Sequence, residues 1–149
     1  MKIDLHVHSR CSTRPSQWIL QKLGCPESFT EPEQLYRIAR ARGMDWVTIT
    51  DHNTIEGALA IAHLPNTFVS EEVTTYFPQD RCKAHVLVYD IDEAIHEDLQ
   101  KVRDNIYELV DYLQWNNIFH VLAHPLFAIN GRLNLDHIEH CDPGFHCPR

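Results

Sequence analysis

Histidine and acidic side chains stand where the apolar, strand-like runs of this sequence begin or end, and this pattern limits the folds that the chain can adopt. The side chains concerned are His6, His8, Asp51, His52, Glu72, His85 and His124. Because side chains alternate between the two faces of a strand, His6 and His8, two positions apart, should point the same way. Two imidazoles arranged in this manner can bind one metal ion. The pattern predicts a fold in which several strand ends meet at a metal site.

The histidines are informative as a set rather than singly. The chain holds 11 histidines among 149 residues, and a lone histidine is more often a core or surface residue than a metal ligand. Here most of them fall at the ends of apolar runs and are accompanied by carboxylates. Imidazole together with carboxylate suits zinc, iron or manganese. The sequence therefore predicts a metal site without fixing the metal.

Length and composition indicate one domain with a substantial core. Hydrophobic residues make up 44% of the chain, which is enough to bury a core of ordinary size. The first eight residues carry charges and ligand-type side chains where a signal peptide needs an apolar stretch, and no window approaches the roughly 18 apolar residues of a membrane span. Five cysteines, an odd number, fit free thiols better than a disulfide framework. We therefore expect a cytoplasmic protein that makes no use of a membrane.

The net charge argues against a large nucleic-acid interface. The formal charge is −8 at pH 7, and binding of a phosphate backbone needs clustered Lys and Arg, which the sequence does not show. Bound divalent cations would still make one cleft locally positive. A small anionic partner is therefore compatible with the sequence, and a long nucleic acid is not favoured.

Periodic patterns predict an alternating α/β chain. Strands are expected at residues 3–8, 46–50, 67–73, 85–89 and 118–123. A short helix is expected between a capping sequence at residues 30–33 and Gly43. Apolar residues at spacings of three and four predict one long helix over residues 95–113. This order of elements favours an α/β fold with a largely parallel sheet.

Five ordered motifs resemble those of the PHP (polymerase and histidinol phosphatase) family of metal-dependent phosphoesterases. They are Asp4-Leu5-His6-Val7-His8-Ser9, Thr50-Asp51-His52, Glu72-Val73-Thr74, His85 and His124-Pro125. Residues 14–18 and 70–74 look most like PHP domains found beside glycosyltransferase genes. The resemblance covers residues 1–135 and implies a distorted, TIM-like (β/α)7 barrel with two or three divalent metal ions at one end. In this chain the barrel would be truncated at its C-terminal end.

The resemblance also implies how the ligands are shared between metal ions. A first ion would be held by His6 and His8, and a second by His85 and His124. Glu72 would bridge the two ions, because a shared negative charge offsets the repulsion between neighbouring cations. Glu71 is the alternative bridge. Glu72 is preferred because an aliphatic residue and then a small polar residue follow it, as in the family.

Departures from the family pattern concern a third metal site. The Asp or His that the family carries just after the first motif is missing, and Arg14 stands near that place. The family's late Asp-x-His pair is also missing, which would leave His52 as the only member of the third site. Arg14 would either bind a substrate phosphate in place of the third cation or be an ordinary solvated loop residue. Asp51 would either contact metal or, as we expect, orient a neighbouring histidine.

Residues 136–149 are interpreted as a separate His/Cys-rich tail. Candidate zinc ligands there are His137, His140, Cys141, His146 and Cys147. Their spacing matches no common structural zinc pattern, and we expect a tail that is disordered or ends abruptly. Asp136 and His137 are alternative candidates for the missing late pair. A barrel cut after its fifth strand would expose a sheet edge, which predicts a homodimer.

The function that the resemblance implies is metal-dependent hydrolysis of a small phosphoester such as a nucleotide or a sugar phosphate. The metal ions would lower the pKa of a bridging water, so that the resulting hydroxide attacks phosphorus in line. The alternative is a non-catalytic metal-binding or regulatory PHP module, which the missing third-site ligands favour. Turnover of a phosphoester separates the two hypotheses.

Overall fold

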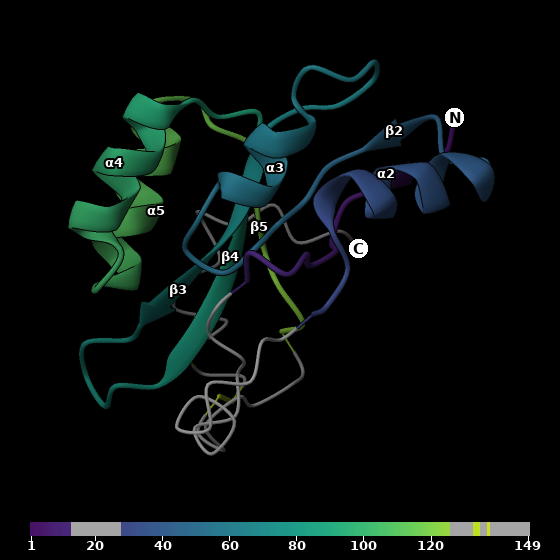
Figure 1. Cartoon of the computed structure of the whole chain (residues 1–149). Coiled ribbons are helices and arrows are strands. Elements are labelled where there is room, and N and C mark those ends of the chain that lie inside the picture. The colour runs from purple at the N-terminus through teal and green to yellow at the C-terminus, as the bar shows by residue number, and fades with distance from the viewer. Residues whose placement is uncertain (13–27, 126–132, 135–136, 138–149) are drawn as a thin grey trace.

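The computed structural model describes residues 1–12, 28–125, 133–134 and 137 of the chain (Figure 1). The elements in chain order are β1 (Ile3–Asp4), α2 (Pro32–Ala41), β2 (Trp46–Val47), α3 (Glu56–Ile61), β3 (Ser70–Tyr76), β4 (Lys83–Tyr89), α4 (Glu93–Val102), α5 (Ile106–Trp115) and β5 (His120–Leu122). Arg14 and nearly all of the predicted tail lie outside the described residues. Among the helices of the described part, none combines the length and the apolar character that crossing a bilayer requires.

In the described part of the chain the strands form two small sheets. β1 and β2 pair in parallel. β3, β4 and β5 form the second sheet in that order, and both of its pairings are antiparallel. Isolated parallel bridges from Val47 to Thr67 and from His52 to Glu72 connect the two sheets. The loops that follow β1 and β2 are thereby brought to the middle of β3.

The predicted seven-stranded barrel is wrong. In the described residues the strands make sheets of two and three strands, and these do not close into a barrel. A (β/α)7 barrel needs parallel strands joined by crossover helices. Here the short connection over residues 77–82 folds β4 back against β3, so the pair is antiparallel. β5 is antiparallel to β4 as well, and the prediction of a largely parallel sheet fails for the same reason.

The helices agree with the sequence pattern in part. α2 buries Leu35 and Ala39 and ends just before Gly43, whose φ of +83° suits glycine. The predicted single helix over residues 95–113 is wrong, because the chain forms α4 and α5 separately. Asn105 caps the start of α5 by accepting a hydrogen bond from the backbone N–H of Tyr107. α3 was not predicted.

The main core lies on one face of the β3–β4–β5 sheet. α4 and α5 lie together on one side of β3 and β4 (Figure 1). Buried residues that pack there include Val73, Val86, Val88, Leu99, Leu109, Leu113 and Leu122. Side chains alternate along a strand, so the neighbours of these strand residues point the other way. That other face of β3 and β4 carries Glu72 and His85.

A second, smaller core holds the N-terminal half together. α2, α3 and the segment around β2 bury Leu35, Ala39, Val47, Ile49, Ala58 and Ile61. Val7, in the loop after β1, packs against this cluster while only partly buried. The loop that carries the first histidine motif therefore rests on the second core and faces β3.

Candidate metal centre

Glu72 is the centre of the candidate site. It lies in β3 with no exposed surface, and so does its neighbour Glu71. The two carboxylates point to opposite faces of the strand, because side chains alternate there. Glu71 reaches α4, where it contacts His96 and Gln100. Of the two carboxylates, only Glu72 faces the loops that carry the histidine motifs, and Glu72 is the one that the sequence favoured.

Imidazole nitrogens surround both carboxylate oxygens of Glu72. Nε2 of His6 and Nε2 of His8 each lie 3.0 Å from Oε2, and Nδ1 of His52 lies 3.6 Å from the same oxygen. On the other oxygen, Nδ1 of His85 lies 2.9 Å and Nε2 of His124 lies 3.1 Å from Oε1. Five histidines from four segments of the chain therefore meet at one buried carboxylate.

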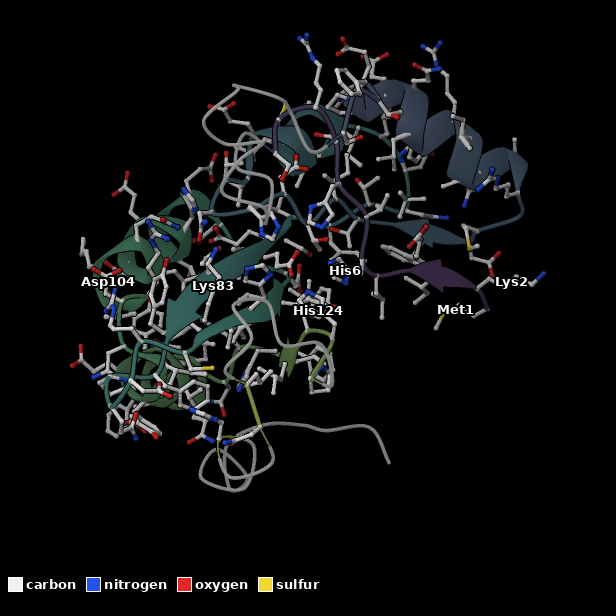
Figure 2. All side chains as sticks on the ribbon, turned by 90° about the horizontal axis from the view of Figure 1, so that it is seen from below. Met1, Lys2, His6, Lys83, Asp104 and His124 are labelled. Carbon is white, nitrogen blue, oxygen red and sulfur yellow. The ribbon has the colours of Figure 1, made fainter. Side chains whose placement is uncertain are left out.

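The structure brings His6 and His124 side by side although 118 positions separate them in the sequence. Figure 2 shows the two side chains next to each other, and their ring centroids lie 5.9 Å apart. Nε2 of His6 lies 3.2 Å from Nε2 of His8. His6 and His8 thus point the same way, although β1 ends at Asp4 and both histidines lie in the loop beyond it.

The loop that carries His6 and His8 is fixed by the segment before His52. The backbone N–H of Thr50 donates to the carbonyl oxygen of Val7 at 2.9 Å, and the backbone N–H of Val7 donates to Oγ1 of Thr50 at 3.2 Å. The backbone N–H of Ser9 donates to Oδ1 of Asp51, and the hydroxyl of Ser9 donates to Oδ2, both at 2.6 Å. The position of the histidine pair therefore depends on Asp51.

Asp51 holds the loop through Ser9 and also interacts electrostatically with His8 and His52. Sequence reasoning expected it to orient a neighbouring imidazole, and this stays a prediction. Burial raises the pKa of Asp51, and the hydrogen bonds from Ser9 oppose this effect. Sequence reasoning gave no role to Ser9 or to Gly57, which packs against both side chains. Ser9, which directly follows the first histidine pair, was the feature of the sequence that could have indicated this contact.

The loop after His52 is fixed to β3 by Asn53. Its backbone N–H donates to the carbonyl oxygen of Glu72 at 3.0 Å, and its Oδ1 accepts from the backbone N–H of Thr74 at 2.8 Å. Nη1 of Arg103 also donates to Oδ1 of Asn53 at 3.0 Å. Asn53 has a φ of 54°, a conformation that asparagine tolerates better than most residues. This contact holds His52 beside Glu72.

The electrostatics favour an ionised carboxylate of Glu72 beside a neutral ring of His85. Burial alone would raise the pKa of Glu72, but hydrogen bonds from His124, His6 and His8 outweigh burial and hold the pKa well below its usual range. Burial lowers the pKa of His85 to about 4, so its ring is neutral at pH 7. A neutral imidazole offers a lone pair, which is what a metal ion requires of histidine.

The ring nitrogens around Glu72 are packed as closely as the ligands of a metal site. Nε2 of His6 and Nε2 of His8 each lie 3.0 Å from Oε2 of Glu72 and 3.2 Å from each other. Nδ1 of His85 is buried and, although 2.9 Å from Oε1, lacks hydrogen-bond geometry. Two groups of ligand atoms have the compactness of a metal site: His6, Glu72 and His124, and His8, His52 and Glu72.

Glu72 belongs to both groups and could bridge two ions. The grouping differs from the predicted one, in which His6 shared an ion with His8, and His85 shared one with His124. His6 and His8 also approach each other closely, so the assignment of ligands to individual ions stays a prediction. His52 lies beside the other histidines, in the group with His8 and Glu72, and its assignment to a third site stays a prediction. Arg14 lies outside the described residues, and its predicted role stays a prediction.

Glu71, on the opposite face of β3, forms a separate polar contact with α4. Its Oε1 lies 2.9 Å from Nδ1 of His96, and its Oε2 accepts from Nε2 of Gln100 at 3.3 Å. The hydrogen bond to Glu71 raises the pKa of His96, against the effect of burial. The raised pKa favours the protonated ring, whose charge would compensate the fully buried carboxylate of Glu71, since burial of a charge without a partner is costly.

This pair predicts a pH-dependent contribution to stability. Because the pKa of His96 is raised in the folded state, the contribution is fully present below the unfolded value of about 6.5 and is lost as the pH rises through the folded value. His96→Gln should lower the free energy of unfolding by about 1–2 kcal/mol at pH 6, and by less at pH 9. Urea unfolding at both pH values measures this, with exposed His63→Gln as the control. An equal loss at both pH values would contradict the charged pair.

Comparisons with known proteins do not assign an activity. No protein-family model matches the chain. A stretch of 73 residues is 40% identical to an uncharacterized protein of Methanocaldococcus jannaschii. This stretch makes up 49% of the chain and covers 41% of that relative, so the chain spans less than half of the relative's length. The functional argument therefore depends on the site itself.

Proposed function

We propose that the chain is a metal-dependent phosphoesterase that hydrolyses a small phosphoester, such as a nucleotide or a sugar phosphate. The observation that carries this proposal is the buried carboxylate of Glu72 with ring nitrogens of five histidines around it. Two ions bound there would activate a water and offset the charge of the phosphoryl oxygens. Zinc, manganese and iron all suit these ligands. Membership of the PHP family is part of the proposal and is supported by the motifs.

The residues of the centre divide into those that face solvent and those that are enclosed. The side chains of His6 and His124 are 33% and 34% exposed, whereas those of His52 and His85 are 4% and 3% exposed. A phosphate group would therefore approach from the side of His6 and His124. The enclosed rings of His52 and His85, together with Glu72, would hold the ions on the side away from solvent.

Residues outside the ligand set keep this arrangement in place. Asp51 fixes the loop of His6 and His8 through Ser9, and Asn53 fixes His52 to β3. Both act on the position of ligands and neither needs to touch the substrate. We therefore assign Asp51 a positioning role on the loop, and the expectation that it also orients an imidazole stays a prediction.

Turnover of an aryl phosphate in the presence of Mn²⁺ tests the proposed function. His8→Ala and His124→Ala should each lower kcat/KM by more than about 100-fold, because loss of a ligand exceeds the 10- to 100-fold effect typical of residues behind the ligands. His63→Ala replaces an exposed histidine away from the centre and should leave the rate unchanged. If turnover survives in both ligand variants, a contaminating phosphatase is the source.

The alternative function is a non-catalytic metal-binding or regulatory module. It shares the metal centre and differs only in turnover. Metal that binds at the histidines, together with no hydrolysis of aryl phosphate, nucleotides or sugar phosphates, would favour it.

The homodimer was predicted from the exposed sheet edge of a cut barrel. It loses that support because the barrel is wrong, and light scattering still tests it.

A further inference from the structure

The turn between β3 and β4 presents two ligand-type side chains away from the histidine centre. Oδ1 of Asp80 accepts a hydrogen bond from the backbone N–H of Cys82 at 2.8 Å. Backbone hydrogen bonds between Phe77 and Cys82 and between Arg81 and Phe77 close the turn. Arg81 has a φ of 59°, which turns the chain sharply between the two ligand-type residues. Asp80 and Cys82 are thereby held on the same turn, with the residue Cys82 fully buried.

His137 approaches this turn from a distant part of the sequence. Its Nε2 lies 3.1 Å from Oδ2 of Asp80, which is 57 positions away. Its ring packs edge-on against Phe77 with the centroids 4.6 Å apart, and its side chain is only 14% exposed. His137 is therefore docked on the turn and does not reach the histidines around Glu72, where the alternative for the missing late pair would have placed it.

Asn134 orients the ring of His137. Nδ1 of His137 lies 2.7 Å from Oδ1 of Asn134 and 3.3 Å from its backbone nitrogen. The backbone N–H of His137 also donates to Oδ1 of Asn134 at 3.1 Å, so the two residues hold the ring in one orientation. Nε2 thereby faces the carboxylate of Asp80. A cation could be held between these two atoms, and a contact that orients the ring through its other nitrogen is the usual support for a metal-binding histidine.

We propose that Asp80, Cys82 and His137 bind one Zn²⁺ ion. Their ligand atoms, a carboxylate oxygen, a thiol sulfur and a ring nitrogen, all lie within 4.8 Å of one another. Zinc takes these three ligand types at about 2.0–2.3 Å, so small movements of the side chains would close the site. Thiolate with imidazole favours Zn²⁺ over Mg²⁺, Ca²⁺ or Mn²⁺. Binding releases the thiol proton of Cys82 to solvent.

The zinc site is separate from the histidine centre and has a different role. Tyr76, at the turn end of β3, is four residues from Glu72, or roughly 13 Å along a strand. The centre around Glu72 contains no sulfur ligand among its described groups. An ion held by His137 on one side and by the β3–β4 turn on the other would fasten the segment of His137 to the sheet. This role does not depend on the proposed phosphoesterase activity.

Cobalt substitution tests the site, because only a cysteine ligand gives Co²⁺ a sulfur-to-metal charge-transfer band in the near ultraviolet. The full chain, freed of metal under reducing conditions, should develop the band as Co²⁺ is added, and Zn²⁺ should abolish it. Cys82→Ser should remove the band. His137→Ala leaves the buried thiol of Cys82 in place. The affinity for Co²⁺, followed by the intensity of the band, should fall at least about tenfold in this variant. Cys11→Ser, at the other described cysteine, should keep it.

The outcomes separate this proposal from the proposed function. Cobalt bound only at histidines gives no sulfur band, so the part of the band that Cys82→Ser removes reports the turn whether or not the centre around Glu72 binds metal. Circular dichroism of each variant shows whether it is folded. A band of full strength in folded Cys82→Ser or folded His137→Ala would overturn the zinc site, and so would no band in the unchanged protein.

Discussion

Replacing Glu72 with glutamine is expected to lower the turnover of an aryl phosphate with Mn²⁺ by at least about 10²–10³-fold, the effect of losing one strong electrostatic contact to a transition state. Glutamine has nearly the same shape but no charge, so it cannot offset the repulsion between two cations. Steady-state kinetics measures the loss. The folded fraction is checked by thermal unfolding, because glutamine also changes the contacts with the five surrounding rings.

The chain supplies a matched control for this prediction in the preceding residue. Glu71 lies in the same strand and is equally buried. Glu71→Gln replaces a carboxylate with an amide, as Glu72→Gln does. Its contacts go to His96 and Gln100 on α4, on the opposite face of β3. Glu71→Gln should therefore lower stability but keep the turnover. Equal loss of turnover in the two variants would mean that Glu72 has no special role.

Gly57→Ala is expected to damage the metal centre through steric contact. A Cβ atom at residue 57 would lie 2.1 Å from Oδ2 of Asp51, 2.6 Å from Oγ of Ser9 and 3.1 Å from Cγ2 of Ile49. Asp51 and Ser9 cannot move apart without releasing the loop that carries His6 and His8. We expect a loss of about 1–3 kcal/mol of stability from overpacking, together with a loss of bound metal.

Gly43→Ala is the control for this glycine substitution. Gly43 has a φ of +83°, but nothing lies within 4 Å of a Cβ atom placed there. Alanine should lower stability by about 1–2 kcal/mol through backbone strain alone and should leave the metal content unchanged. Metal content per chain, measured beside thermal unfolding, therefore distinguishes damage to the centre from a general loss of stability. A full metal complement in Gly57→Ala would contradict the role assigned to Asp51.

The relation between neighbouring ligands could be predicted because it depends on local geometry. The two-residue spacing of His6 and His8 predicted through strand alternation that they point the same way. Their nitrogens do lie 3.2 Å apart, although both residues are in the loop beyond β1. The same alternation sends Glu72 and Glu71 to opposite faces of β3. Which of the two faced the histidines could be inferred only from the residues that follow, Val73 and Thr74. In the structure, Glu72 is the one that faces the histidines.

The topology could not be predicted in the same way, because a strand pattern does not say which direction the strand runs. Residues 67–73 and 85–89 were expected as strands, and β3 and β4 lie close to these positions. Their antiparallel pairing depends on the tight connection over residues 77–82, which was not identified as a hairpin turn. The parallel barrel was inferred from the resemblance and from the order of elements, and the hairpin contradicts it.

Contacts between distant segments also escaped the sequence. The role of Asp51 depends on Ser9, 42 positions earlier, and the docking of His137 on Asp80 spans 57 positions. Neither pair shares a local spacing that a periodic pattern would show. The break between α4 and α5 is different, because Asn105 is a favoured capping residue and was a local signal that the apolar stripe concealed.

The metal content of the purified chain tests the central claim most directly. The measurement uses Cys82→Ser protein, so that the proposed zinc site does not contribute, prepared without a chelator or a histidine tag and analysed by elemental mass spectrometry. We expect about two ions per chain of zinc, manganese or iron, which matches the two ligand groups that share Glu72. A folded chain that holds no metal, and that none of these ions can load, would contradict the metal centre and the function proposed from it.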